Sequence, residues 1–283
     1  MSGAMTSKTV AITGATSGIG EVAAIRLAEQ GARIVFTARD GTRAQATMTK
    51  LRAANGAADH AAIIADLSRL DEMKRVGLEL AALPRIDVLI NNAGALFNHR
   101  RETADGLEMT FALNHMAYFV VTDIVLPRLG PGARIVNVAS RAHRGATLDF
   151  DDLQSKRGYS GFAVYSKSKL CNILFTRELA RRLPEGVTAN CLHPGFVATR
   201  FGDQSGGLMR HLIRVAKPLG AIAPEEGAKT IIYLAAAPEV EGVSGEYFYQ
   251  CRIDTPSAEA RSDADAKRLW EISRRIMETG SAP

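Results

Sequence analysis

The chain has 283 residues, 46% of them hydrophobic and 23% charged, a balance typical of a soluble globular protein with one large α/β domain or two small ones. The net charge of +5 comes from short, scattered basic clusters without any nucleic-acid-binding motif, so a nucleic-acid partner is not expected. Three distant cysteines argue against a disulfide framework or a metal site, and with no secretory signal they predict a cytoplasmic protein.

Apolar runs and turn residues predict strands that alternate with helices along the whole chain. Residues 1–7 are expected to be flexible, and no run reaches the length of a membrane span. The predicted strands are 8–13, 33–38, 61–65, 86–91, 133–139, 187–192 and 246–250. Two predicted helices follow the first and third strands; one ends near residue 30, and the other is capped by Ser68 and ends before Pro84. The other predicted helices span 42–54, 105–126, 161–182, 224–236 and 262–278.

This alternation indicates βαβ units, and therefore a parallel sheet with helices on both faces. No linker, repeat or low-complexity tract divides the chain, so we expect a single domain, 1–283. The final helix, 262–278, has acidic residues in its first turn and Gly280 just beyond it, as helix ends commonly do.

A glycine-rich turn joins the first strand to the first helix. Its sequence is Thr-Gly-x3-Gly-x-Gly, with glycines at 14, 18 and 20. Glycines let the backbone approach a pyrophosphate, and the helix N-terminus offers amide donors and positive potential. In this strand–turn–helix context the turn predicts a dinucleotide-binding site rather than a structural turn alone.

Tyr165 and Lys169 are four residues apart in a predicted helix, which places both side chains on one face. A nearby ammonium favours the phenolate, so Lys169 is expected to lower the pKa of Tyr165. Alone the pair is a weak signal. It gains weight from the glycine-rich turn and from Ser140, which ends the fifth predicted strand.

These motifs occur in the order seen in the short-chain dehydrogenase/reductase family, which the chain resembles over almost its whole length. The ordered set is the glycine-rich turn, Asn91–Gly94, Ser140, Tyr-x3-Lys, and Pro-Gly-x3-Thr at 194–199. Finer features at 139–143, 193–195, 224–227, 242–245 and 268–271 resemble its retinol dehydrogenase-like branch. The resemblance implies a Rossmann-type doubly wound α/β sheet and an NAD(P)-dependent oxidoreductase.

The resemblance also implies roles for four residues. Tyr165 would be the general acid in carbonyl reduction and the base in alcohol oxidation. Lys169 would bond the nicotinamide ribose, and Ser140 would donate to the substrate oxygen. Asn114 would hold a water that connects Lys169 to solvent. From the residues alone, Ser140 could equally be a turn cap and Asn114 a polar residue satisfied inside its helix.

His143 and His193 are expected to be structural rather than catalytic. The resemblance also implies a set of residues around the cofactor. The cofactor residues are Gly14, Thr16, Ser17, Gly18, Ile19, Gly20, Arg39, Asp66, Leu67, Asn92, Ala93, Gly94, Tyr165, Lys169, Pro194, Gly195, Val197 and Thr199.

The end of the second strand bears on the choice of cofactor. NAD-preferring enzymes place an acid there, but this chain has Ala38 followed by Arg39, whose guanidinium suits a 2′-phosphate. We therefore predict NADP(H) over NAD(H), with NAD(H) as the alternative. Ser17 is not basic, and Asp40 is close enough in sequence to compete for Arg39.

Residues 200–223 lie where the family places its substrate lid, and their glycines and apolar side chains predict a mobile amphipathic cover. We expect an apolar alcohol, aldehyde or ketone of retinoid-like, lipid-derived or steroid-like kind. The alternatives are packing of this segment on the core or a partner subunit, or contact with a membrane surface. The family resemblance implies a homodimer or homotetramer.

Two other functions fit parts of the sequence. A dinucleotide-binding sensor without turnover would keep the glycine-rich turn but would not need Ser140, Tyr165 and Lys169 together. A sugar-nucleotide epimerase or dehydratase of the extended relatives would differ in the first turn and carry a larger C-terminal domain. About 85 residues follow Pro194–Gly195, which is too few for that domain.

Overall fold

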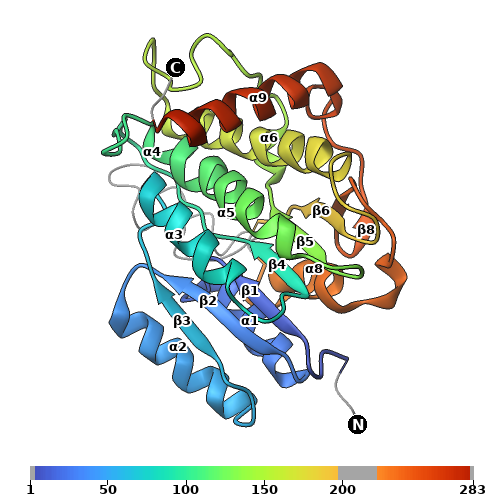
Figure 1. The fold of residues 1–283 in the computed structure, drawn as a ribbon. Helices are drawn as coiled ribbons and strands as arrows, with labels where there is room; N and C mark the ends of the chain where they lie inside the picture. Colours follow the sequence, from blue (N-terminus) through green and yellow to red (C-terminus); the bar gives the residue numbers. More distant parts are fainter. Residues whose placement is uncertain (1–3, 197–221, 281–283) are drawn as a thin grey trace.

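The computed structural model describes residues 4–196 and 222–280. In that part of the chain, eight strands form one sheet in the order β3-β2-β1-β4-β5-β6-β7-β8 (Figure 1). The first seven strands are parallel, and β8 runs antiparallel to β7. The strands are β1 (Thr9–Ile12), β2 (Arg33–Ala38), β3 (Ala61–Ile64), β4 (Val88–Asn91), β5 (Arg134–Val138), β6 (Thr188–Leu192), β7 (Tyr247–Tyr249) and β8 (Arg252–Ile253).

Helices cover both faces of this sheet. One face carries α1 (Gly18–Glu29), α2 (Gly41–Ala54) and α8 (Pro224–Ala236). The other carries α3 (Leu70–Ala81), α4 (Met109–Phe111), a π-helical segment (Ala112–Met116), α5 (Ala117–Val125) and α6 (Gly161–Ala180), with α9 (Asp263–Thr279) packed on α6 (Figure 1). The predicted single-domain, doubly wound Rossmann-type fold is confirmed.

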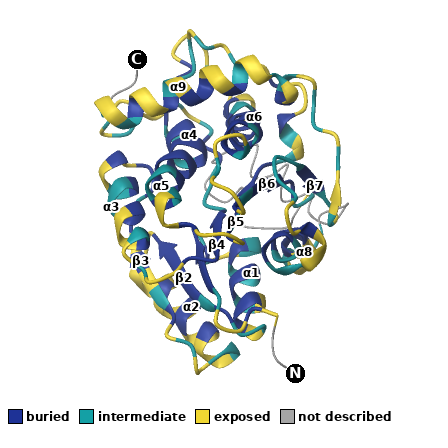
Figure 2. Cartoon of the chain, turned by 45° about the vertical axis from the view of Figure 1, so that its right-hand side comes forward, coloured by how far each residue is buried: buried dark blue, intermediate teal, exposed yellow. Residues whose placement is uncertain are grey.

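The core consists of two apolar layers, one on each face of the sheet. The inner strands are almost entirely buried, the edge strands β3 and β8 are largely exposed, and the helices keep exposed outer faces (Figure 2). Because the chain moves outward from β1 to β2 and β3, and then returns to the other side with β4, the strand order reverses between β1 and β4. Ligands of open α/β sheets bind at such a reversal, beyond the carboxyl ends of the strands.

Several predicted helix ends are confirmed by their caps. Asp40 caps α2 by accepting the N–H of Arg43 at 2.8 Å. Ser262 caps α9 through the N–H of Asp265, and Gly280 ends that helix in the left-handed conformation with a φ of 75°. These are local interactions, which is why the sequence alone indicates them.

Other predicted boundaries are wrong. Ser68 does not cap α3; it bonds Asp66, and the N–H of Leu70 is satisfied by the carboxylate of Asp105 at 3.0 Å. The helix expected from residue 105 begins at Met109, because Glu108 caps it by accepting the N–H of Phe111. The strand β8 was not predicted.

The segment Met109–Arg128 is long and apolar enough to cross a membrane, the one such helix in the described ranges. However, 72% of its most apolar 18-residue window is buried inside the fold. It packs against α3 and α6, as a core helix does. Its apolar character is therefore explained by its place between these helices.

Candidate active site

Residues that follow six of the parallel strands line one cleft of about 1570 Å³. This exceeds the roughly 300–1,000 Å³ of common ligand pockets, so there is room for a dinucleotide and a second reactant. The predicted residues that line it are Gly14, Thr16, Ser17, Gly18, Ile19, Gly20, Arg39, Asp66, Leu67, Asn92, Ala93, Gly94, Ser140, Tyr165, Lys169, Pro194 and Gly195.

Two predicted cofactor residues and most of the predicted lid cannot be placed. Val197 and Thr199 lie outside the described residues, as do residues 200–221 of the lid. Ile222 is described and lines the cleft, and Ala223 is the residue before α8.

The glycine-rich turn forms a cradle that fits a pyrophosphate. Gly14 has a φ of 69°, and a Cβ there would lie 2.9 Å from the Cα of Ala93. A Cβ on Gly20 would lie 2.3 Å from the side-chain nitrogen of Asn92. Ser17 precedes α1 without a side-chain cap, so the first N–H groups of the helix are available to an anion.

The loop after β4 is tied to the glycine-rich turn. The hydroxyl of Thr13 accepts the backbone N–H groups of Asn92 and Ala93 at 2.9 and 3.0 Å. One residue earlier, Asn91 donates to Asn137 at 2.8 Å and so joins β4 to β5 inside the sheet. This loop therefore both steadies the sheet and shapes the cleft. Thr13 was not among the predicted site residues.

Ser140, Tyr165 and Lys169 meet at the wall of the cleft formed by β5 and α6. Ser140 follows β5, and its hydroxyl accepts the N–H of Ala142 at 3.1 Å and also bonds the Tyr165 side chain. Tyr165 and Lys169 lie one turn apart on α6, with the lysine Nζ 5.7 Å from the centre of the tyrosine ring. Ser140 thus caps a turn and faces Tyr165 at once.

Burial moves the pKa values of this pair in opposite directions. It raises the pKa of Tyr165 to about 12, although the hydrogen bond with Ser140 opposes the rise. It lowers the pKa of Lys169 to about 7. The expectation that Lys169 lowers the pKa of Tyr165 is therefore wrong for this state, because loss of hydration dominates both groups.

Asn114 lies behind the cleft wall, within the π-helical segment, and is fully buried. Its side chain accepts the N–H of Ala95 and donates to the carbonyl of Ala95 and the hydroxyl of Ser168. It therefore ties the β4 loop to α6. π-Helical segments are frequent at functional sites, where they displace one residue from the helical register.

The far end of the cleft carries two exposed arginines. Arg39 follows β2 and Arg43 lies in the first turn of α2, and both line the cleft beside Ser17. Among the ion pairs of the described residues, none joins Arg39 to Asp40, whose carboxylate is occupied at the start of α2. Arg43 was missed because only the orientation of α2 brings it there.

The other end of the cleft is largely apolar. Phe162 and Phe196 are 53% and 54% exposed, although both are large apolar side chains. Both line the cleft, so their exposed rings add apolar surface to it. The apolar lining residues at this end that were not predicted are Leu96, Phe97, Met109, Leu113, Phe162 and Phe196, and Ile222 joins them from the predicted lid.

Two histidines support loops of the cleft, as structural residues. His143 is buried, and its Nδ1 bonds the Ser140 carbonyl at 2.7 Å. His193 stacks on Tyr249, with ring centres 4.0 Å apart, and its Nδ1 accepts the N–H of Gly195 at 3.2 Å. They therefore hold the backbone on either side of the reacting groups.

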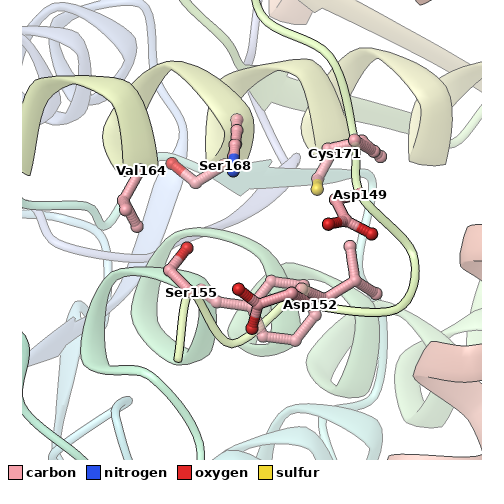
Figure 3. Close-up of a pocket in the computed structure, with 10 residues that line it drawn as sticks. Asp149, Asp152, Ser155, Val164, Ser168 and Cys171 are labelled. Carbon is pink, nitrogen blue, oxygen red and sulfur yellow. The ribbon is translucent and has the colours of Figure 1, made fainter. Parts of the chain in front are cut away.

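A second, narrow pocket of about 10 Å³ lies beside another face of α6 (Figure 3). Ser155, Ser168, Asp152 and Cys171 point into it, and it is large enough for about one water molecule. Burial raises the pKa of the Cys171 thiol to about 12, so this thiol is unreactive near neutral pH. The large cleft is therefore the candidate active site.

A cradle for a pyrophosphate at the reversal of strand order, next to a serine, a tyrosine and a lysine, defines a dinucleotide-dependent oxidoreductase. The family profile of short chain dehydrogenase matches residues 8–206. The chain belongs to this family, and it is an oxidoreductase that acts on CH–OH groups with NAD or NADP.

Among curated proteins, the chain is similar to retinol dehydrogenase 14 of Homo sapiens, with 42% identity over 96% of this chain and 86% of the relative. Retinol dehydrogenase 13 of Homo sapiens is 37% identical over 95% and 84% of the two chains. The predicted retinol dehydrogenase-like branch is thereby confirmed.

Solved structures show the same fold. A putative uncharacterized protein from Mycobacterium paratuberculosis has a TM-score of 0.78 and 29% identity, covering 98% of this chain and 96% of its own. A short chain dehydrogenase from Burkholderia cenocepacia in complex with NADP has a TM-score of 0.70 and 26% identity, covering 91% and 99%.

Proposed function

We propose that this protein uses NADP(H) to interconvert an apolar alcohol and its aldehyde or ketone, of retinoid-like, lipid-derived or steroid-like kind. The observation that carries the proposal is the placement of Ser140 and Tyr165 in one cleft between an anion cradle and an apolar end. The names of the retinol dehydrogenase relatives support a retinoid-like or similar apolar substrate.

The residues of the cleft divide the reaction among them. The bound dinucleotide supplies or accepts the hydride. Ser140 donates a hydrogen bond to the substrate oxygen, and Tyr165 transfers its phenolic proton to that oxygen as negative charge develops on it. Lys169 bonds the nicotinamide ribose. Asn114 keeps the β4 loop in register with α6 and holds a water that connects Lys169 to solvent.

The pKa values favour the reductive direction near neutral pH. Because burial raises the pKa of Tyr165 to about 12, the phenol keeps its proton and is ready to donate it. In the oxidative direction the same residue must first lose that proton, which becomes easier as the pH rises. We therefore expect alcohol oxidation to gain more from alkaline pH than carbonyl reduction does.

The two arginines at the far end support NADP(H) over NAD(H). Ala38 offers no carboxylate to a ribose 2′-hydroxyl, whereas Arg39 and Arg43 offer two guanidinium groups to a 2′-phosphate. Asp40 is occupied as the cap of α2, which leaves Arg39 to the ligand.

The dimeric or tetrameric state and the cytoplasmic location stay predictions.

A graded series of substrates tests the proposal. NADPH oxidation is measured with straight-chain aldehydes of increasing length and with retinal. We expect kcat/KM to rise with each added methylene by up to about fourfold, as apolar surface becomes buried. Efficiency that falls steadily as the chain lengthens would contradict an apolar substrate.

A matched pair of variants connects this trend to the cleft. Phe162→Ser removes an apolar lining residue, while Leu78→Ser removes a side chain that is 63% exposed on α3 and is not among the residues lining the cleft. We expect Phe162→Ser to flatten the dependence on chain length and Leu78→Ser to leave it unchanged. Equal effects would place the apolar binding surface elsewhere.

A further inference from the structure

Lys169 is a buried cation without an acidic partner. None of the ion pairs in residues 4–196 and 222–280 includes it, and its side chain is almost wholly inaccessible. Its ammonium donates to the Val138 carbonyl at 2.9 Å. It also lies 5.7 Å from the ring centres of both Tyr118 and Tyr165. One carbonyl and two aromatic faces therefore hold this ammonium in place.

The Val138 carbonyl receives more donors than it can bond well. Besides Lys169, the side-chain nitrogen of Asn172 donates to it at 3.2 Å and the hydroxyl of Tyr118 at 3.4 Å. A carbonyl oxygen has two lone pairs, so three donors compete for two places. The Tyr118 contact is the longest of the three.

We propose that Tyr118 and Asn172 are positioning residues that keep the Val138 carbonyl satisfied when Lys169 turns from it toward the bound dinucleotide. A buried carbonyl left without a donor is costly, and these two donors remove that cost. The inference rests on the proposed role of Lys169 as the ligand of the nicotinamide ribose. Neither positioning residue lines the cleft, so both act through Lys169.

The surroundings of Tyr118 suit this role. It is fully buried on α5, four residues after Asn114, and lies near both Lys169 and Tyr165. The neighbouring His115 takes no part, since its Nε2 bonds Ser273 beneath α9. In the described residues, the hydroxyl of Tyr118 has one hydrogen-bond acceptor, the Val138 carbonyl that it shares with Lys169.

The test is a double-mutant cycle that measures NADPH affinity by fluorescence titration, independently of turnover. The proteins are wild type, Tyr118→Phe, Lys169→Ala and the double variant. Tyr118→Phe removes one hydroxyl and leaves the ring, so we expect NADPH to bind about fivefold more weakly in the wild-type background. In the Lys169→Ala background the same substitution should change the affinity little, because no ammonium has to move.

A control separates this effect from loss of a tyrosine hydroxyl in general. Tyr233→Phe removes a hydroxyl from α8, on the opposite face of the sheet, and should leave the NADPH affinity unchanged. Should Tyr118→Phe fail to fold, Asn172→Ser removes the other donor in the same cycle. Melting temperatures of all variants exclude a loss of folded protein as the cause.

The outcomes distinguish this inference from the proposed function. Equal weakening by Tyr118→Phe in both backgrounds would show that the hydroxyl does not act through Lys169, and no weakening in either would show that it does not act at all. Both results overturn the inference. If Lys169→Ala binds NADPH as tightly as wild type, the proposed role of Lys169 fails, and the inference fails with it.

Discussion

At the scale of single residues, burial prepares a tyrosine and a lysine for different tasks. Tyr165 keeps its proton because its pKa rises to about 12, whereas Lys169 is poised to lose its proton because its pKa falls to about 7. A proton donor and a cation that titrates near neutral pH therefore lie one helical turn apart. The sequence spacing predicts their proximity, but not the sign of the effect on Tyr165.

The buried Lys169 predicts a pH-dependent stability. Its pKa is about 7 when folded and 10.5 ordinarily, so burial of the charge destabilises the fold fully below pH 7 and not at all above 10.5. Lys169→Met removes this cost. Relative to wild type, the variant should be more stable at pH 6 than at pH 9.5 by about 3 kcal/mol. Urea unfolding at both pH values measures the difference, and a pH-independent difference would contradict it.

The two arginines predict the basis of cofactor choice. Arg39→Ala and Arg43→Ala should each weaken NADPH binding about tenfold, because a charged hydrogen bond contributes about 1.5–3 kcal/mol, and should change NADH binding far less. Arg52→Ala, on the last turn of the same helix α2 and outside the cleft, is the matched control. Titration of both reduced cofactors measures the effect. Equal weakening of NADPH and NADH binding would show that these arginines do not bind the 2′-phosphate.

At the scale of elements, the glycine-rich turn depends on close backbone packing. Gly14→Ala adds a Cβ 2.9 Å from the Cα of Ala93 at a φ of 69°, so it must push the β1 and β4 loops apart. We expect loss of detectable NADPH binding in calorimetry. Gly106→Ala is the control, because its φ is 74° but nothing lies within 4 Å of the added Cβ. If Gly106→Ala weakens NADPH binding as much as Gly14→Ala does, the loss comes from backbone strain and not from the close packing of Gly14 against Ala93.

Elements with local signals could be predicted from the sequence within a residue or two. The helix 224–236 is found at its predicted bounds, and α9, predicted at 262–278 with Gly280 beyond it, spans Asp263–Thr279. The start of α3 could not be predicted, since Asp105 supplies its cap from 35 residues away. Nor could β8, which pairs with β7 through a turn whose two residues, Gln250 and Cys251, adopt positive φ without glycine.

The candidate site divides in the same way. Residues that follow strands, such as Ser140 and Asn92, were predicted from the family resemblance, and they lie together because parallel strands bring their carboxyl ends to one edge. Residues on helix faces, such as Arg43 and Tyr118, were missed because their place depends on how α2 and α5 pack. Val197 and Thr199 lie outside the described residues, so their predicted roles stay predictions.

At the scale of the whole molecule, two packed layers bury most reactive groups. Burial raises the pKa of both Cys171 and Cys191 to about 12, while Cys251 is partly exposed. In the folded protein at pH 8, a thiol reagent should therefore label Cys251 first and the other two only after unfolding. Mass spectrometry of the labelled peptides reads the order. Rapid labelling of all three would contradict the packing around α6 and β6.

The central claim is that Tyr165 donates the proton in an NADP(H)-dependent reduction, and Tyr165→Phe tests it most directly. The substitution removes the hydroxyl and keeps the ring on α6. The measurement is the single-turnover rate of NADPH oxidation at saturating carbonyl substrate, with NADPH affinity determined on the same protein. We predict a rate about 10²–10⁴-fold lower with affinity nearly unchanged, whereas a rate within about twofold of wild type would contradict the account.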